Sequence, residues 1–222
     1  MLKTNLRIFV QAALLGLMVF GCASYQAQKE TARWQCDQEA DAAFAGGDWQ
    51  AALSGHERLL ASQPENGLAL YHIGYIMGHL GDRHKEIEFY QRALDCGYRQ
   101  DDQLFFNLGM ALGDLGDVAA GRDALRIAVS LNPDNPDNHF GLGLAEQAGG
   151  RTDEARSAFE HAVRLAPEDW EARLALARLL IDLDQWDQAA VQINTVLSTD
   201  PANEDALTLR QALENRRALQ YK

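Results

Sequence analysis

A sequence period of about 34 residues runs through most of this chain. Glycines followed by an acidic or polar residue recur once in each period, at Gly47, Gly81, Gly116 and Gly150. Prolines recur with the same period, except that the first two members are two periods and a single insertion apart: Pro64, Pro133, Pro167 and Pro201. Such self-similarity is the signature of a repeat architecture, in which small units stack on their neighbours.

Two further columns keep the same period. One holds glycines flanked by alanines: Ala40, Gly74, Gly109, Gly143 and Ala177. The other holds mostly small residues: Ala52, Glu86, Gly121, Ala155 and Ala189. Tyr98 stands where the proline column lacks a member, and Asp101 is the single insertion. Chance does not account well for four columns that share one period.

The stretch 105–117, FFNLGMALGDLGD, shows what the columns mean physically. A glycine inside a helix costs roughly 1 kcal/mol relative to alanine, so Gly109 needs a reason. We expect it where two helices touch too closely for a side chain. Gly116 ends the helix in a left-handed conformation, and Asp117 caps the next helix. Pro133 then separates one unit from the next, and Asn135 starts the following helix.

This pattern of two helices in each unit resembles the tetratricopeptide repeat. The resemblance implies an all-α, right-handed superhelical solenoid of helix-turn-helix repeats. It covers residues 33–203 as five repeats: 33–66, 67–100, 102–135, 136–169 and 170–203. Residues 204–222 are expected to form a C-terminal capping helix, which shields the last core from water. Residues 23–32 are polar and are expected to form a short tether.

The N-terminus has the features of an export signal, with Lys3 and Arg7 before the apolar run 8–20. That run is shorter than the roughly 20 residues that cross a bilayer. It ends in Val19, Phe20, Gly21 and Cys22, which resembles the lipobox of bacterial lipoproteins. The resemblance implies that 1–21 is a signal peptide and that Cys22 is acylated, with palmitate among its acyl chains. Secretion with cleavage after Ala23, or a retained anchor, are the alternatives.

The lipobox resemblance also suggests a location. Because Ala23 rather than aspartate follows Cys22, the protein is expected in the cell envelope, in the outer membrane facing the periplasm. The net charge of −12 argues against nucleic acid as a partner.

The sequence offers little catalytic chemistry, and we expect no enzyme, no cofactor and no metal site. The histidines have no zinc-type cysteine spacing. His72 and His79, which could share a helix face, are interpreted as polar rim residues of a solvated groove rather than as a metal pair. Cys36 and Cys96 are placed on helices that are not nearest neighbours, so a disulfide between them is not expected.

The remaining candidate is the concave groove. In the repeat family that the chain resembles, the first helix of each repeat lines this groove through a few fixed positions. Those positions predict eight peptide-binding residues: Tyr71, Tyr75, Phe106, Met110, Gly113, Phe140, Leu144 and Arg178. Asn107 is added because one subclass of the family uses an asparagine in the groove. The set is largely apolar and aromatic. Gly113 would deepen a pocket beside an aromatic residue by removing a side chain, unless the cap helix or the tether covers the groove.

One subclass of the family grips a C-terminal carboxylate with lysine, asparagine and arginine. Asn107 alone matches that set, so a chaperone-tail adaptor is disfavoured. The sequence favours a protein–protein interaction scaffold anchored in the bacterial envelope, similar in layout to repeat lipoproteins that assist pilus or secretin assembly. The alternatives are an adaptor for cell-wall enzymes or for polysaccharide export. An enzyme acting on a wall substrate is the less favoured class, because this architecture hosts interaction far more than catalysis.

Overall fold

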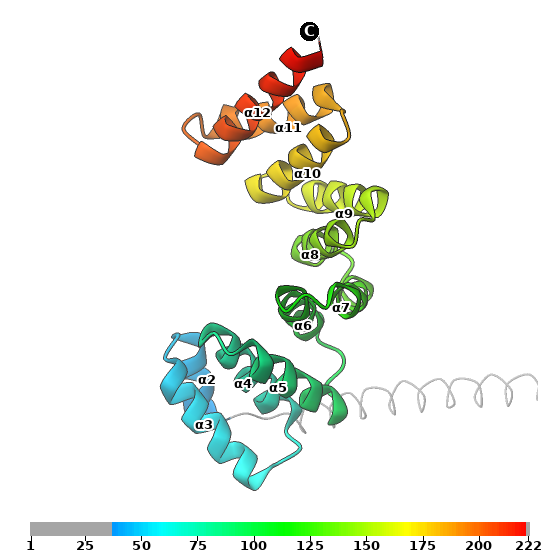
Figure 1. The fold of residues 1–222 in the computed structure, drawn as a ribbon. Helices are drawn as coiled ribbons and strands as arrows, with labels where there is room; N and C mark the ends of the chain where they lie inside the picture. The colour runs from blue at the N-terminus through cyan, green and yellow to red at the C-terminus, as the bar shows by residue number, and fades with distance from the viewer. Residues whose placement is uncertain (1–36, 221–222) are drawn as a thin grey trace, which may run out of the picture. The chain divides into compact units, whose positions relative to one another are not determined.

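The computed structural model describes residues 37–220, which form eleven helices and contain no strand. Figure 1 labels them α2 to α12. The predicted signal peptide, Cys22, the tether and Cys36 lie outside the described residues. Among the described helices, none has the length and apolarity that crossing a bilayer requires. The all-α repeat fold expected from the sequence is confirmed.

The described residues divide into two compact units, and we describe each by itself. Unit 1 comprises residues 37–80 and 88–98, and unit 2 comprises residues 81–87 and 99–220. Unit 1 holds three whole helices and the second part of a fourth: α2 (Gln38–Ala45), α3 (Trp49–Ser62), α4 (Gly67–His79) and α5 (Arg83–Asp95). The helix α3 packs against both α2 and α4.

Unit 2 is a stack in which each helix packs against the next one in the chain. Its whole helices are α6 (Asp102–Asp114), α7 (Val118–Leu131), α8 (Pro136–Ala148), α9 (Thr152–Leu165), α10 (Trp170–Asp182), α11 (Trp186–Thr199) and α12 (Glu204–Gln220). Two pairs of alternate helices also touch, α6 with α8 and α10 with α12. This second layer of contacts places parts of neighbouring repeats side by side.

Each tight turn between paired helices has a residue with positive φ in the glycine column. The angles are 74°, 83°, 85° and 71° at Gly47, Gly81, Gly116 and Gly150. The fifth turn uses Asp184 instead, at a φ of 58°. Aspartate is one of the few side chains that tolerate this region. The predicted end of the helix at Gly116 is thus confirmed, and the column extends to a residue that is not glycine.

Side-chain caps begin the helices where the sequence predicted them. The Asp117 Oδ1 atom accepts a hydrogen bond from the Ala120 backbone N–H at 3.1 Å. The Asn135 Oδ1 atom accepts one from the Asp137 backbone N–H at 3.0 Å. Pro133 lies in the turn between α7 and α8. The Asp117 and Asn135 side-chain oxygens satisfy backbone donors that a helix start leaves without an intrahelical partner.

A polar network joins the starts of α6 and α8. The side-chain amides of Asn135 and Asn138 donate hydrogen bonds to the Asp102 Oδ2 atom at 3.0 and 2.8 Å. Burial acts to raise the pKa of Asp102, but the hydrogen bonds from the asparagines outweigh it, and the pKa lies below its usual value. The carboxylate therefore stays ionised and ties two repeats together.

The column of glycines flanked by alanines, which includes Gly109 and Gly143, marks close helix contacts. A Cβ atom at Gly109 would lie 2.8 Å from the Gly121 carbonyl oxygen and 2.6 Å from the Leu125 Cγ atom. One at Gly143 would lie 2.5 Å from the Phe159 ring. All three distances are shorter than real Cβ contacts. The prediction that Gly109 permits close packing is confirmed.

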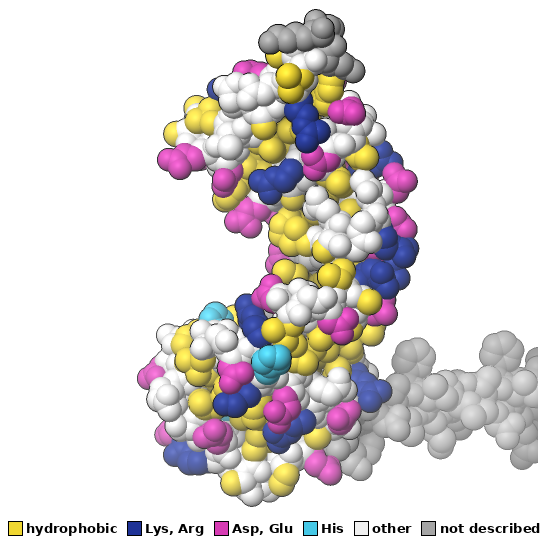
Figure 2. Space-filling view, viewed as in Figure 1, with side chains coloured by type: hydrophobic (Ala, Val, Ile, Leu, Met, Phe, Trp, Pro, Cys, Tyr) yellow, Lys and Arg dark blue, Asp and Glu magenta, His cyan; other side chains and the backbone are white. Residues whose placement is uncertain are grey.

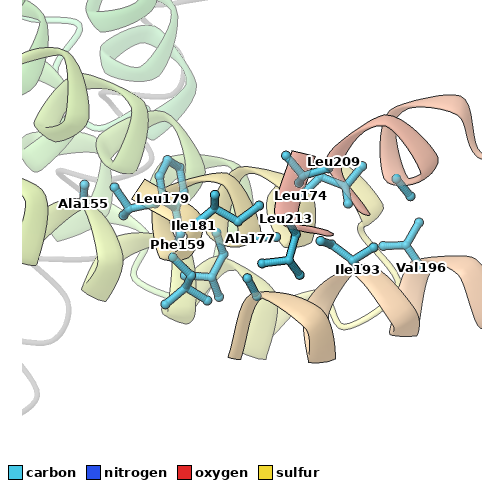
Figure 3. Close-up of a cluster of buried hydrophobic side chains, with 14 residues drawn as sticks. Ala155, Phe159, Leu174, Ala177, Leu179, Ile181, Ile193, Val196, Leu209 and Leu213 are labelled. Atoms are coloured by element: carbon cyan, nitrogen blue, oxygen red, sulfur yellow. The ribbon is translucent and has the colours of Figure 1, made fainter. Parts of the chain in front are cut away.

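The end of unit 2 holds a cluster of buried hydrophobic side chains from α9 to α12 (Figure 3). Ala206, Leu209 and Leu213 of α12 are each at most 8% exposed within this cluster. Leu219 of the same helix is 72% exposed. One face of α12 thus covers the core of α10 and α11, as expected of a capping helix.

Candidate functional site

An apolar pocket of about 200 Å³ lies in unit 2, where α6, α7 and α8 meet. Three of the predicted groove residues, Met110, Gly113 and Leu144, line it together. Val118, Leu125 and Ala148 add further apolar wall. Figure 2 shows hydrophobic side chains reaching the surface of unit 2 beside charged ones. The structure therefore gathers residues one repeat apart into a single pocket.

Two glycines shape this pocket in different ways. Gly113 is exposed, and a Cβ atom there would meet no heavy atom within 4 Å. Gly141 is buried, and a Cβ atom there would lie 2.9 Å from both Leu125 and Phe106 and 3.4 Å from the Met110 sulfur. Gly113 thus leaves the mouth of the pocket open, whereas Gly141 lets the floor close tightly.

A charged group stands at the rim. Asp114, which also lines the pocket, pairs with the Arg83 guanidinium at 3.0 Å. Arg83 in turn donates a hydrogen bond to the buried Glu86 at 2.6 Å. An apolar interior with a fixed polar rim is the usual layout of a protein-binding surface.

The other predicted groove residues of unit 2 lie outside this pocket. The half-buried Phe140 ring lies 5.9 Å from the buried Phe159 ring, centroid to centroid. The Asn107 Oδ1 atom lies 3.5 Å from the Gln103 side-chain amide, at the limit of a hydrogen bond. Phe106 is half-buried, and Arg178 is exposed on α10.

Tyr71 and Tyr75 belong to unit 1, where they have different surroundings. Tyr71 is only 8% exposed, because its ring lies 5.8 Å from those of Tyr90 and Tyr98. Tyr98 is the residue that replaces the column proline, so a ring fills the place of a turn residue. Tyr75 is half-buried, with its ring 5.2 Å from that of Phe44.

An aromatic and histidine cluster surrounds Tyr75 on α2, α3 and α4. The exposed His79 ring stacks on Trp49 at 4.4 Å. The His72 ring stacks on Phe44 at 4.3 Å, and its side chain is 15% exposed. The interpretation of His72 as a solvated rim residue is therefore wrong, because the helix pairing turns it inward. His79 does reach solvent.

The inward side of this cluster brings Asp41, His56 and His72 together. One possible ligand atom from each lies within 4.8 Å of the other two. The His72 Nδ1 atom is 3.5 Å from the Asp41 Oδ1 atom. This group was not predicted from the sequence, since its members lie on three helices and match no short metal motif. Comparing equivalent positions between repeats would have marked each of the three as a polar residue where two later repeats are apolar, but not that the three meet.

Burial controls the charge of the two histidines. Burial and the nearby His56 lower the pKa of His72 to about 4. Burial also lowers the pKa of His56, although the negative charges of Asp41 and Asp37 oppose the shift. Both imidazoles are therefore neutral near pH 7, the form in which histidine binds metals.

The expectation that Cys36 and Cys96 form no disulfide stays a prediction. Cys96 is half-buried and directly follows α5. Its predicted counterpart, Cys36, is outside the described range.

Models of a known protein family match the segments that form these helices. Models of the tetratricopeptide repeat match residues 38–102, 106–169 and 146–213. Tetratricopeptide repeat protein 8 of Caenorhabditis elegans is 36% identical over 56 residues, which are 25% of this chain and 11% of that protein. The chain thus spans a small part of that relative's length.

Solved structures resemble the chain over most of its length. The crystal structure of MamA is 22% identical, with a TM-score of 0.68 over 75% of this chain and 96% of MamA. YrrB, described as having an unusual peptide-binding site, is 20% identical, with a TM-score of 0.69 over 78% and 88%. Pseudomonas aeruginosa pilF is 19% identical, with a TM-score of 0.68 over 81% and 83%. These identities show a shared fold. Because the family models together match more than half of its residues, the chain belongs to the tetratricopeptide repeat family.

Proposed function

We propose that this protein is a scaffold anchored in the bacterial cell envelope that helps to assemble an envelope machine of the pilus or secretin type. Tetratricopeptide repeats are scaffolds for protein–protein interaction, and that coarser role follows from the family. The observation that carries the proposal for a specific binding site is the apolar pocket of α6, α7 and α8.

The pocket suits an amino-acid side chain. Its volume of about 200 Å³ is below the roughly 300–1,000 Å³ of sites for drug-sized molecules. Burying one leucine, methionine or phenylalanine side chain contributes about 1.5–3 kcal/mol. One apolar anchor of a partner protein in this pocket would therefore supply a large part of a moderate affinity, as interface anchors do.

Two further observations support the proposed location and the proposed class of partner. The N-terminal sequence resembles a lipoprotein signal ending at Cys22, which supports an envelope location. Among the similar structures are Pseudomonas aeruginosa pilF and a repeat protein with a peptide-binding site, which support a partner of the protein class.

The test is recovery of partners by the full chain, tagged at its C-terminus and purified from membranes in mild detergent. Gly113→Leu should lower recovery of the partner at least tenfold, because the new side chain occupies the open mouth of the pocket. Met110→Ser combined with Leu144→Ser should do the same by removing the apolar walls. Circular dichroism of each preparation should match that of the parent.

The matched control is Val191→Ser on α11, which removes an apolar side chain that is 59% exposed and outside the pocket. It should leave recovery unchanged. Undiminished capture of the same partner by Gly113→Leu would show that the pocket is not the binding site. Mass spectrometry of the recovered proteins then separates pilus or secretin components from cell-wall enzymes and export proteins.

A further inference from the structure

Three potential metal ligands converge in unit 1 from three consecutive helices. Asp41 lies on α2, His56 on α3 and His72 on α4. One ligand atom from each is within 4.8 Å of the others. They do not take part in the apolar pocket of unit 2, so they are a separate feature of the fold.

Polar atoms of His56 and Asp41 are buried without a hydrogen-bond partner. His56 is 0% exposed, and neither of its ring nitrogens has a hydrogen-bond partner. The Asp41 side chain is 44% exposed, but its Oδ1 atom is buried, and its contact with the His72 Nδ1 atom at 3.5 Å does not have hydrogen-bond geometry. A buried donor or acceptor without a partner destabilises a fold, so each such group in a native protein requires an explanation.

Packing does not explain these residues, because equivalent positions in a later repeat are apolar. Two periods along the chain, counting the insertion at Asp101, the three positions are occupied by Met110, Leu125 and Gly141. These three also meet, since a Cβ atom at Gly141 would lie 2.9 Å from Leu125 and 3.4 Å from the Met110 sulfur.

One repeat further along, the equivalent positions hold Leu144, Phe159 and Ala175. Phe159 is fully buried in the hydrophobic cluster, and Leu144 and Ala175 pack against that cluster. We call this recurring place, formed by two helices of one repeat and the first helix of the next, the inter-repeat locus. The fold fills it with apolar side chains in two later repeats, so it does not require an aspartate and two histidines in the first.

The donor set has a definite chemistry. Two imidazole nitrogens and a carboxylate oxygen are a ligand set that zinc uses, at about 2.0–2.2 Å from the metal. Ligand atoms around one tetrahedral ion lie about 3.3 Å apart, so small side-chain rotations would close the present separations. Phe44, stacked on His72 at 4.3 Å, supplies the apolar wall that commonly surrounds such a site.

We propose that Asp41, His56 and His72 form a binding site for a divalent transition-metal ion, with Zn²⁺ as the best match. The ion gives a partner to one of the two buried ring nitrogens of His56 and to the Asp41 carboxylate. Because three helices supply the ligands, binding links α2, α3 and α4 and stabilises unit 1. A fourth coordination position remains for water or for a group from another molecule.

The experiment is calorimetric titration of the chelator-treated full chain with Zn²⁺, in detergent and with a purification tag that lacks histidine. The parent should bind one Zn²⁺ per chain and gain several degrees in melting temperature. Mg²⁺ prefers oxygen ligands, so it should produce neither effect. His72→Gln should weaken Zn²⁺ binding at least 100-fold, and Asp41→Asn at least tenfold.

His56→Leu separates a ligand role from a structural one. It installs the residue type that occupies the equivalent position at Leu125, so the metal-free protein should keep or raise its melting temperature while losing the Zn²⁺ site. His79→Gln, in the same aromatic cluster but outside the ligand group, should bind Zn²⁺ like the parent. If the parent binds no Zn²⁺, or His56→Leu binds it with parental affinity, the proposed site does not exist.

Discussion

Gly109 and Gly113 lie one helical turn apart on α6, but a Cβ atom would meet close neighbours at Gly109 and open space at Gly113. Gly109→Ala should destabilise the protein by about 1–3 kcal/mol, because its Cβ atom would lie 2.8 Å from the backbone oxygen of Gly121. Gly113→Ala should stabilise it by about 0.4–1 kcal/mol, because nothing lies within 4 Å and the unfolded chain loses freedom. Urea unfolding of both variants measures the two effects.

Each of these variants is the control for the other, since the same methyl group is added to the same helix. Equal losses of stability would mean that the packing around Gly109 and Gly113 does not determine the effect of an added Cβ atom. A gain at Gly109 would contradict the close contact between α6 and α7.

The sequence predicted residues well where a column has one physical cause. The left-handed turns at Gly47 to Gly150 follow from the period, because glycine meets no steric penalty there. The left-handed residue of the fifth turn, Asp184, was not predicted, because it is an aspartate, which tolerates the same conformation as glycine. Tyr71 was predicted to line a groove, but it is 8% exposed and its ring lies 5.8 Å from that of Tyr98. Tyr98 follows the next helix, α5, and a contact of this kind is not visible in a period.

At the scale of helices, the two faces of α12 lead to a second stability prediction. Leu213→Ala should cost about 2–5 kcal/mol, because the side chain is 3% exposed in the core of α10 and α11. Leu219→Ala removes the same atoms from a side chain that is 72% exposed and should change stability little. Thermal unfolding followed by circular dichroism distinguishes them. Equal effects would show that α12 does not cap the core.

Helices and their order could be read from the sequence, because each repeat carries its own start and stop signals. The candidate sites could be read only in part. Met110 and Leu144 were found because they occupy one column on first helices. Asp41 and His56 were missed because the locus that they share with His72 joins different columns on three helices, so it becomes visible only once the helices are packed.

At the scale of the whole molecule, the proposed lipid anchor at Cys22 can be tested by substitution. Cys22→Ser should release the protein from membranes or leave it as the unprocessed precursor, because acyl chains on that cysteine would supply the anchor. Cell fractionation combined with the mass of the purified protein measures both outcomes. Cys96→Ser, which lies in the repeat region, should leave fractionation unchanged. A processed Cys22→Ser protein that stays in the membrane would contradict lipidation.

The two candidate sites lie in different units, which allows them to be disabled separately. The metal ligands are in unit 1, and the apolar pocket is in unit 2. The three metal ligands and the residues that line the pocket have no member in common, so a variant of one site removes no side chain from the other. Loss of Zn²⁺ binding in His56→Leu and loss of partner capture in Gly113→Leu are therefore separate results, and neither implies the other.

The inter-repeat locus bears on how a repeat chain acquires new chemistry. Each locus touches only its own repeat and the next one, so a substitution there is felt locally rather than throughout the array. Duplication of a repeat supplies a spare copy of the locus, and three substitutions separate an apolar filling such as Met110, Leu125 and Gly141 from a set of polar ligands. An array of this kind can diversify one locus at a time while the others keep the stack folded.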